Sequence, residues 1–282
     1  MYDLLSLYVG SNVLFSFMYD GKDFTVDLSE DFYGQNFWER VSKSEYEPDT
    51  LDFLRRNCDQ ETIFMDVGAA NGAMTLVAAS LGAEVFSYEP DPLMNRVLTR
   101  NVNLNPNVNE KIKISNCALA AKKGETEFSK GSNSSVLSSI VFSGNRDERE
   151  TKIKISAISD ELKSLYKGGS QIVIKMDIEG AEWGILGDHA TVQSLQTHKV
   201  KMLLAVHPGF HRPHKKFLPG INRFSFEIWR MRNFIEAYKL FSGLSKVATI
   251  KRTNLNPVIS AKMFAALCLA GYLEFIIEFN SN

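Results

Sequence analysis

A turn rich in small residues follows a short apolar run in the first third of the chain. The run Ile63–Val67 leads into Gly68-Ala69-Ala70-Asn71-Gly72, and a small, apolar stretch of helical character, Ala73–Leu81, comes next. Glycine and alanine let a backbone lie against a ligand where larger side chains would collide. The Asp66 carboxylate could orient this turn or meet an ammonium group. The segment predicts a ligand site with these members: Asp66, Gly68, Ala69, Asn71 and Gly72.

The glycine spacing argues against one large class of enzyme. Nicotinamide dehydrogenases carry Gly-x-Gly-x-x-Gly at such a turn, whereas this chain has Gly-x-x-x-Gly from Gly68 to Gly72. Small residues at a strand–helix junction can also serve packing alone. A ligand site is therefore inferred only if a second motif lies beside the turn.

That second motif ends the next predicted strand. The strand Glu84–Tyr88 leads into Glu89, Pro90 and Asp91, and Glu89 comes 23 residues after Asp66. An acid at about this offset can accept hydrogen bonds from both hydroxyls of a ribose. The alternative is that these residues only start the following helix. The two motifs in register favour ligand binding, with Glu89, Pro90 and Asp91 among the contacts.

A third group of acids follows the apolar strand Gln171–Met176. Asp177 comes directly after it, and Glu179 and Glu182 follow. Open α/β sheets bind ligands at the carboxyl ends of their strands, so Asp177 is predicted to lie in the site. We expect one of the two glutamates to cap the next helix instead.

Three histidines, His207, His211 and His214, follow the apolar strand Lys201–Val206. They stand in a proline-broken loop without the fixed helical spacing of a robust zinc site, so no metal is predicted. Of the three histidines, His207 is the candidate base, because an ordinary histidine pKa of about 6.5 suits proton transfer.

These positions need a sheet that brings successive strand ends together. Buried strands alternate with helical stretches from Thr62 onward, which predicts a three-layer α/β sandwich with a mostly parallel sheet and helices on both faces. Further elements are expected at Leu93–Asn103 (helix), Lys111–Cys117 (third strand) and Phe224–Phe241 (helix). Leu273–Phe279 is expected as an antiparallel C-terminal edge strand. Ser129–Glu150, rich in serine and charge, is expected to be a loop near the mouth of the site or an inert insertion.

The N-terminal part reads differently. Val13–Met18 and Phe24–Leu28 flank a turn at Tyr19-Asp20-Gly21-Lys22, which predicts a hairpin, and a helix is expected over Asp49–Asn57. We expect residues 1–57 to form an N-terminal elaboration and residues 58–282 a ligand-binding domain.

Taken together, the chain resembles the FkbM family of methyltransferases. The likeness runs from about Tyr46 to His207, and its most specific part is Lys175-Met176-Asp177-Ile178-Glu179-Gly180-Ala181-Glu182. It also includes Tyr46-Glu47-Pro48, the Asp66–Gly72 turn, Tyr88–Pro92, Asn116–Leu119 and Ile158–Leu162. The resemblance implies a class I methyltransferase fold of Rossmann-like type, S-adenosylmethionine as donor, and O-methylation of a hydroxyl on a sugar, glycan or other small molecule.

The resemblance also implies roles for single residues. Asp66, Gly68, Ala69 and Gly72 would frame the methionine portion of the donor, Glu89 would hold the ribose and Asn116 would lie beside the adenine. Asp177 would sit where the methyl group meets the acceptor, and Asp177 or His207 could take the acceptor's proton. Two departures from the family pattern matter. Ala70 stands where an asparagine is usual, and Ala205 stands where a glutamate is usual.

The distribution of charge along the chain does not identify the class of methyl acceptor. The net charge is −1, yet residues 198–262 hold thirteen Lys or Arg against two acids. This stretch could form solvated faces or a positive rim that attracts an anionic acceptor. An RNA ribose or cap methyltransferase is therefore an alternative, although no lysine run with interleaved aromatics is present. A non-catalytic domain that binds S-adenosylmethionine is a further one.

Composition bears on the compartment. The three cysteines, Cys58, Cys117 and Cys268, are widely spaced and predict neither disulfides nor a zinc site. Neither apolar end segment has the features of an export signal or a bilayer span, so a cytoplasmic protein is expected.

Overall fold

The computed structural model describes residues 13–128, 151–166, 168–178, 181–206, 222–253, 258–269 and 274–280. The predicted loop Ser129–Glu150 and the histidine segment from His207 to His214 lie outside these ranges.

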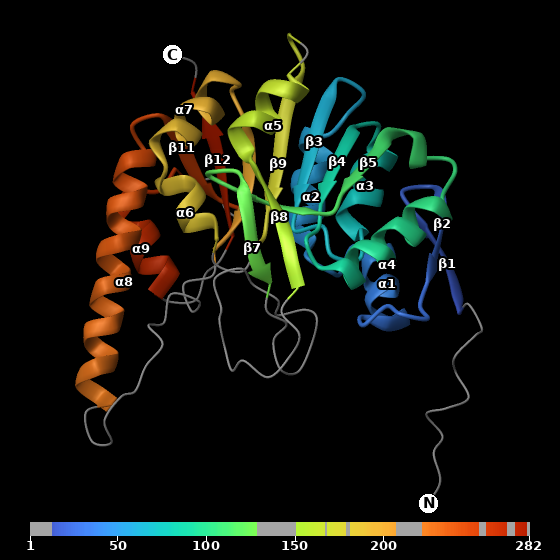
Figure 1. The fold of residues 1–282 in the computed structure, drawn as a ribbon, viewed down its shortest axis with the longest axis horizontal. Coiled ribbons are helices and arrows are strands. Elements are labelled where there is room, and N and C mark those ends of the chain that lie inside the picture. The colour runs from blue at the N-terminus through green and yellow to red at the C-terminus, as the bar shows by residue number, and fades with distance from the viewer. Residues whose placement is uncertain are drawn as a thin grey trace, which may run out of the picture.

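A seven-stranded sheet runs through the centre of the molecule, with strand order β11-β12-β10-β9-β3-β4-β5 (Figure 1). In chain order its strands are β3 (Thr62–Val67), β4 (Glu84–Tyr88), β5 (Ile112–Ser115), β9 (Gln171–Met176), β10 (Lys201–Ala205), β11 (Ala248–Arg252) and β12 (Glu274–Phe279). Every neighbouring pair between β10 and β5 is parallel, and β12 is antiparallel to both of its neighbours. The order reverses between β3 and β9, and a reversal of this kind leaves a crevice at the carboxyl ends of the two strands.

Helices cover both faces of this sheet, as predicted. Alternate side chains of a buried strand point to opposite faces: Phe64 and Val173 pack with the helices of one face, and Met65 and Ile174 with those of the other. The first face carries α2 (Pro48–Asn57), α3 (Ala73–Leu81), α4 (Pro92–Asn103) and, farther out, α1 (Gly34–Ser42). The second carries α5 (Ile158–Leu165), α6 (Glu182–Gly187), α7 (His189–Thr197), α8 (Asn222–Leu244) and α9 (Ala261–Leu269). The three-layer α/β sandwich is confirmed.

The C-terminal strands differ in detail from the expectation. The expected antiparallel strand is present as β12, but it lies one position in from the edge, between β10 and β11. The edge itself is β11, in which Ile250 pairs with Ile277 of β12. Local sequence pattern identifies strands but does not give their order in space, and β11 had no pattern that predicted it.

The third predicted strand also ends earlier than expected. β5 stops at Ser115, and Cys117 begins β6 (Cys117–Ala120). β6 belongs to a separate three-stranded sheet with β8 (Thr151–Ala157) and β7 (Gly124–Phe128), in the order β6-β8-β7. One apolar run thus supplies two sheets, because the chain changes direction at Asn116.

The predicted N-terminal hairpin is confirmed. β1 (Leu14–Tyr19) pairs with β2 (Lys22–Asp27) across a two-residue turn in which both Asp20 (φ 49°) and Gly21 (φ 74°) are left-handed. This is the turn that matches the twist of a hairpin. The hairpin, α1 and α2 share a hydrophobic cluster with α3 and one face of the sheet. The division at residue 57 stays a prediction.

Two asparagines of α4 and the turn after it hold the hairpin in place. The Asn105 side chain accepts from the Thr25 N–H (2.9 Å) and donates to the Thr25 carbonyl (2.7 Å), as a neighbouring strand would. The Asn101 side chain accepts from the Asp27 N–H (2.9 Å) and donates to the Asn71 carbonyl (2.9 Å). α4 therefore connects the hairpin to the glycine-containing turn.

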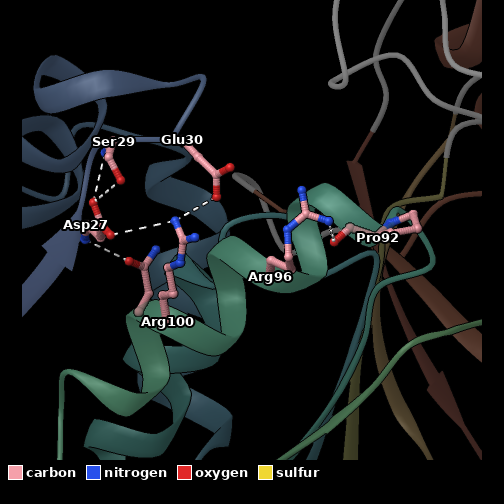
Figure 2. A network of polar contacts seen from close by, with 7 residues as sticks. Asp27, Ser29, Glu30, Pro92, Arg96 and Arg100 are labelled. Carbon is pink, nitrogen blue, oxygen red and sulfur yellow. Dashed lines mark hydrogen bonds and ion pairs between the residues drawn. The ribbon is translucent and has the colours of Figure 1, made fainter. Parts of the chain in front are cut away.

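Charged groups surround this junction. Figure 2 shows Arg100 reaching Glu30 (2.6 Å) and Asp27 (3.8 Å), with Ser29 bound to the Asp27 carboxylate. The Arg100 and Glu30 side chains are about two-fifths exposed, and exposed ion pairs add little to the free energy of unfolding. We therefore expect the buried asparagines to contribute more than these ion pairs to the attachment of the hairpin.

None of the helices in the described ranges is both long enough and apolar enough to cross a bilayer.

Replacement of Asn105 tests this attachment. Asn105→Ala leaves the N–H and carbonyl of Thr25 without partners in a largely buried place, so we expect the free energy of unfolding to fall by about 2–4 kcal/mol. Asn107→Ala is the control, because among the described residues Asn107 makes one exposed hydrogen bond, to the Asp23 carbonyl at 3.3 Å. It should cost about 0.5 kcal/mol or less. Urea unfolding measures both; equal effects would contradict the strand-like role of Asn105.

Candidate functional site

The turn after β3 lies at the crevice and has three left-handed residues: Gly68 (φ 84°), Ala70 (φ 49°) and Gly72 (φ 89°). Glycine adopts this conformation freely, whereas an alanine pays a steric cost. The N–H groups of Gly68 and Ala69 both donate to the Tyr88 carbonyl, at 3.0 and 3.2 Å. The turn is therefore attached to the end of β4.

Gly68 is required by the neighbouring chain. A Cβ on Gly68 would lie 2.1 Å from the Asp177 carbonyl oxygen, and the Asp177 N–H donates to the Val67 carbonyl at 3.0 Å. A side chain here would push β3 and β9 apart. At Gly72 a Cβ would meet the Leu98 side chain at 2.5 Å. Both glycines allow close packing, so substitutions there would disturb the fold before they tested a ligand contact.

Glu89 has the most defined position in this region. It is 7% exposed, and its two carboxylate oxygens accept from the N–H groups of Ala70 (2.9 Å) and Asp91 (2.8 Å). Burial raises the pKa of Glu89 to about 7, although these two hydrogen bonds lower it. Each oxygen retains a lone pair, so the carboxylate could accept two further hydrogen bonds.

The neighbours of Glu89 have structural partners of their own. Asp91 caps α4, accepting from the Leu93 N–H at 2.8 Å, so the helix-start interpretation holds for this acid. Pro90 is partly exposed beside it. Asn116, exposed after β5, donates to the Glu89 carbonyl at 3.2 Å and so lies at the same edge of the sheet.

Asp66 is fully buried near the end of β3. One of its oxygens accepts from the Thr75 hydroxyl at 2.7 Å, and the other has no hydrogen-bond partner among the described residues. Burial raises the pKa of Asp66, while the charge of Lys175 lowers it. A buried carboxylate oxygen without a donor is costly and calls for an explanation.

Lys175 lies directly across from Asp66 in the β3–β9 pairing. Its side chain is 10% exposed, and its Nζ is 3.6 Å from the Asp177 carboxylate. Burial lowers the pKa of Lys175, but the charges of Asp177, Asp66 and Glu47 raise it, and the net effect is upward. Lys175 therefore stays charged, and it holds the carboxylates of several segments near one point.

The N-terminal region also reaches this point. Burial raises the pKa of Tyr33 to about 12, and Tyr33 is close enough to Lys175 to interact with its charge. The rings of Tyr33 and Phe37 are 4.7 Å apart, and those of Phe37 and Tyr46 are 4.5 Å apart. The three rings form an aromatic wall from α1 to the start of α2.

Asn71 and Ala69 face away from the crevice or are enclosed. The Asn71 amide donates to Asp31 (3.4 Å), whose carboxylate also accepts from the Trp38 ring N–H (2.6 Å). Ala69 is buried. Their predicted contacts with a ligand stay predictions; the contacts that the structure gives Asn71 connect the turn to α1.

A family model described as Methyltransferase FkbM domain matches residues 66–239. The chain belongs to this family. The matched segment starts at Asp66 and includes the turn, Glu89, Asn116, Lys175 and Asp177, and it covers more than half of the sequence.

Solved methyltransferase structures resemble the chain at low identity. A methyltransferase FkbM from Methylobacillus flagellatus KT is 13% identical, with 84% of this chain and 60% of that chain covered and a TM-score of 0.40. An O-methyltransferase from Bacillus cereus in complex with SAH is 13% identical, with coverage of 90% and 95% and a TM-score of 0.42. An rRNA methylase from Streptococcus thermophilus is 10% identical, with coverage of 83% and 95% and a TM-score of 0.36. No curated protein matches.

The two departures from the family pattern lie at informative places. Ala70 has a left-handed backbone, a conformation that asparagine adopts more readily than alanine, so the usual asparagine would be less strained here. Ala205 ends β10, and its partner across the antiparallel pairing is Glu274 of β12. A carboxylate thus stands beside the position where the family usually has one.

Some expected residues fall outside the site as described, and others were missed. His207 and Glu179 lie outside the described residues. The sequence patterns did not predict a place in the site for Lys175, Tyr33, Tyr46, Glu47 or Glu274. A lone charge in the apolar run Gln171–Met176 was a usable signal for Lys175. No local signal pointed to Glu274.

Within the described ranges, no group of three or more His, Cys, Asp or Glu side chains could hold a metal.

A separate groove of about 850 Å³ opens between α6, α7 and α8. Its lining includes Trp183, Leu186, Lys239 and Leu244, and none of the candidate site residues. It is therefore distinct from the crevice at the strand ends.

The raised pKa of Glu89 predicts a pH dependence of stability. The ordinary glutamate value is about 4.5 and the folded value about 7, so the folded state binds the proton more tightly. Stability from this group is complete below pH 4.5 and is lost as pH rises through 7, on the order of 3 kcal/mol in all. Glu89→Gln should flatten the fall in the free energy of unfolding over this range, measured by urea unfolding at several pH values. Parallel curves for parent and variant would show that Glu89 is not buried as described.

Proposed function

We propose that the chain transfers a methyl group from S-adenosylmethionine to a hydroxyl oxygen of a small-molecule or glycan acceptor. The observation that carries this proposal is the Glu89 carboxylate. It is buried at the end of β4, held by N–H groups from two loops, and retains a free lone pair on each oxygen. Such a group suits the two hydroxyls of a ribose.

The residues of the crevice fit the donor in its three parts. One oxygen of Asp66, two residues before Gly68, has no hydrogen-bond partner among the described residues, and an ammonium group or an ordered water could satisfy it. Glu89 would accept from the ribose, and Asn116 stands at the same edge for the adenine. Membership of a methyltransferase family supports the same donor.

In methyl transfer the main task of the protein is to align the donor and the acceptor. The bound donor supplies an electrophilic methyl group on a sulfonium. The chain's part is to hold an acceptor oxygen in line with that methyl, which is worth several kcal/mol, about 7 or more in favourable cases. Lys175 fixes Asp177 at the switch point, so Asp177 is suited to orient the acceptor. Its catalytic role, and that of His207, stay predictions.

The negative charge of the crevice favours some acceptors over others. Glu47, Asp66 and Asp177 interact with a single buried cation, Lys175. An acceptor with phosphates near the reacting atom would meet several carboxylates, which is unfavourable. We therefore favour a neutral hydroxyl over an anionic acceptor or an RNA. A measurement of turnover distinguishes the enzyme from the alternative, a non-catalytic domain that binds S-adenosylmethionine.

Binding of the donor tests the proposal. Glu89→Ala removes two charge-assisted hydrogen bonds, each worth about 1.5–3 kcal/mol, so the Kd for S-adenosylmethionine should rise at least tenfold in calorimetry. Glu84→Ala is the matched control: Glu84 starts the same strand at its other end and pairs with Lys113 at 2.9 Å. Its Kd should equal that of the parent protein.

Methyl-labelled S-adenosylmethionine with a panel of sugars, glycans, RNA and small alcohols then identifies the acceptor. Label in an ether linkage is the expected result. A parent protein that does not bind S-adenosylmethionine, or one whose Glu89→Ala variant binds equally well, would overturn the proposal.

A further inference from the structure

Glu274 lies at the same edge of the sheet as the crevice, although it is far from it in sequence. It is the first residue of β12, and it pairs with Ala205, the last residue of β10. Because β12 runs antiparallel, its start meets the carboxyl ends of the parallel strands. Asp177 follows β9, the next strand beyond β10, at that edge.

The surroundings of Glu274 are acidic. Its charge interacts with Glu47 and Asp49 at the start of α2, with Lys175 of β9, and with Asp177 directly after that strand. The start of α2 is attached to this region, since the Thr253 hydroxyl donates to Asp49 at 3.0 Å. On its own sheet, Ala205 opposite it is uncharged, and β11 brings Arg252 opposite Phe275.

The carboxylate of Glu274 has no fixed partner among the described residues. It is partly buried and makes no hydrogen bond or ion pair there, whereas Asp177 is paired with Lys175. Burial, with the neighbouring carboxylates, raises the pKa of Glu274 to about 7. Because Glu274 is only partly buried, solvent can reach its carboxylate, and the group stays available to accept a proton.

We propose that Glu274 is the catalytic base that takes the proton of the acceptor hydroxyl. The inference rests on the proposed function. The acceptor oxygen forms its bond to the methyl carbon with a lone pair, the carbon–sulfur bond breaks with its electrons left on sulfur, and the hydroxyl proton passes to the Glu274 carboxylate. The products are a methyl ether, a neutral thioether and protonated Glu274, which releases its proton to water.

The properties of Glu274 suit this role better than those of Asp177. A base works best when its pKa is near the working pH and when it is free to accept. Glu274 meets both conditions, while Asp177 is engaged by Lys175. Asp177 and Lys175 would then hold the acceptor hydroxyl for Glu274.

A comparison of two ligands tests the placement without any acceptor. S-adenosylmethionine carries a positive sulfonium, and S-adenosylhomocysteine lacks the methyl and the charge. A carboxylate beside the transferring methyl should respond to that difference, whereas Glu89 at the ribose should respond similarly to both. Carbon-13 NMR of glutamate labelled at the carboxyl carbon follows each titration directly.

We expect a Glu274 signal titrating near pH 7, absent in Glu274→Gln and present in Glu278→Gln. Glu278 is the matched control, because it lies on the same strand, four residues on, and pairs with Lys251 at 2.7 Å. Its pair is outside the proposed site. The Glu274 midpoint should be lower by about one pH unit or more with S-adenosylmethionine than with S-adenosylhomocysteine. Equal midpoints in the two complexes would overturn the inference.

Turnover on the acceptor found by labelling gives the second readout. Glu274→Gln should lower kcat about a hundredfold and leave the Kd for S-adenosylmethionine within a few-fold, and Glu278→Gln should match the parent. Near-parent turnover of Glu274→Gln would overturn the inference while leaving the proposed function intact. Failure of the parent to bind S-adenosylmethionine would instead overturn the proposed function.

Discussion

Lys175 carries its charge in the interior of the sheet, on one of the two strands that border the crevice. A buried cation is tolerated only when carboxylates compensate it, and removal of one partner of such a pair is strongly destabilising. That compensation comes from Asp177 directly after the same strand, Asp66 directly across on β3, and Glu47 at the start of α2. This requirement gathers groups from three segments at the strand ends. The crevice is acidic because these carboxylates lie close to Lys175 and compensate its charge.

The N-terminal region supports the same place from outside the sheet. Asn101 connects β2 to the Asn71 carbonyl, and Asp31 connects Trp38 to the Asn71 side chain. The turn is thus bonded on its outer side, while Gly68 packs on its inner side against Asp177 and Ile178, directly after β9. The N-terminal segment, predicted as an elaboration, therefore contributes to the geometry of the turn. It also contributes the aromatic wall of Tyr33, Phe37 and Tyr46.

The sequence predicted the parts of the fold that local pattern encodes. The alternation from Thr62 onward, the hairpin at Asp20-Gly21 and the position of Glu89 beside the turn all follow from short-range chemistry. The insertion of β12 between β10 and β11, and hence the place of Glu274, depends on pairing between distant segments, which no local window contains. Asn71 was a reasonable ligand contact by motif, but the partner that it has, Asp31, lies far back in the chain. Acceptor contacts from His207 stay predictions because His207 lies outside the described residues.

The crevice at the ends of β3 and β4 is proposed to bind S-adenosylmethionine through Glu89. A crystal structure of the protein with S-adenosylhomocysteine would show this contact. We expect both ribose hydroxyls within hydrogen-bond distance of the Glu89 carboxylate, with the methionine portion over the Asp66–Gly72 turn. Density for the ligand elsewhere, with Glu89 bonded only to the N–H groups of Ala70 and Asp91, would contradict it.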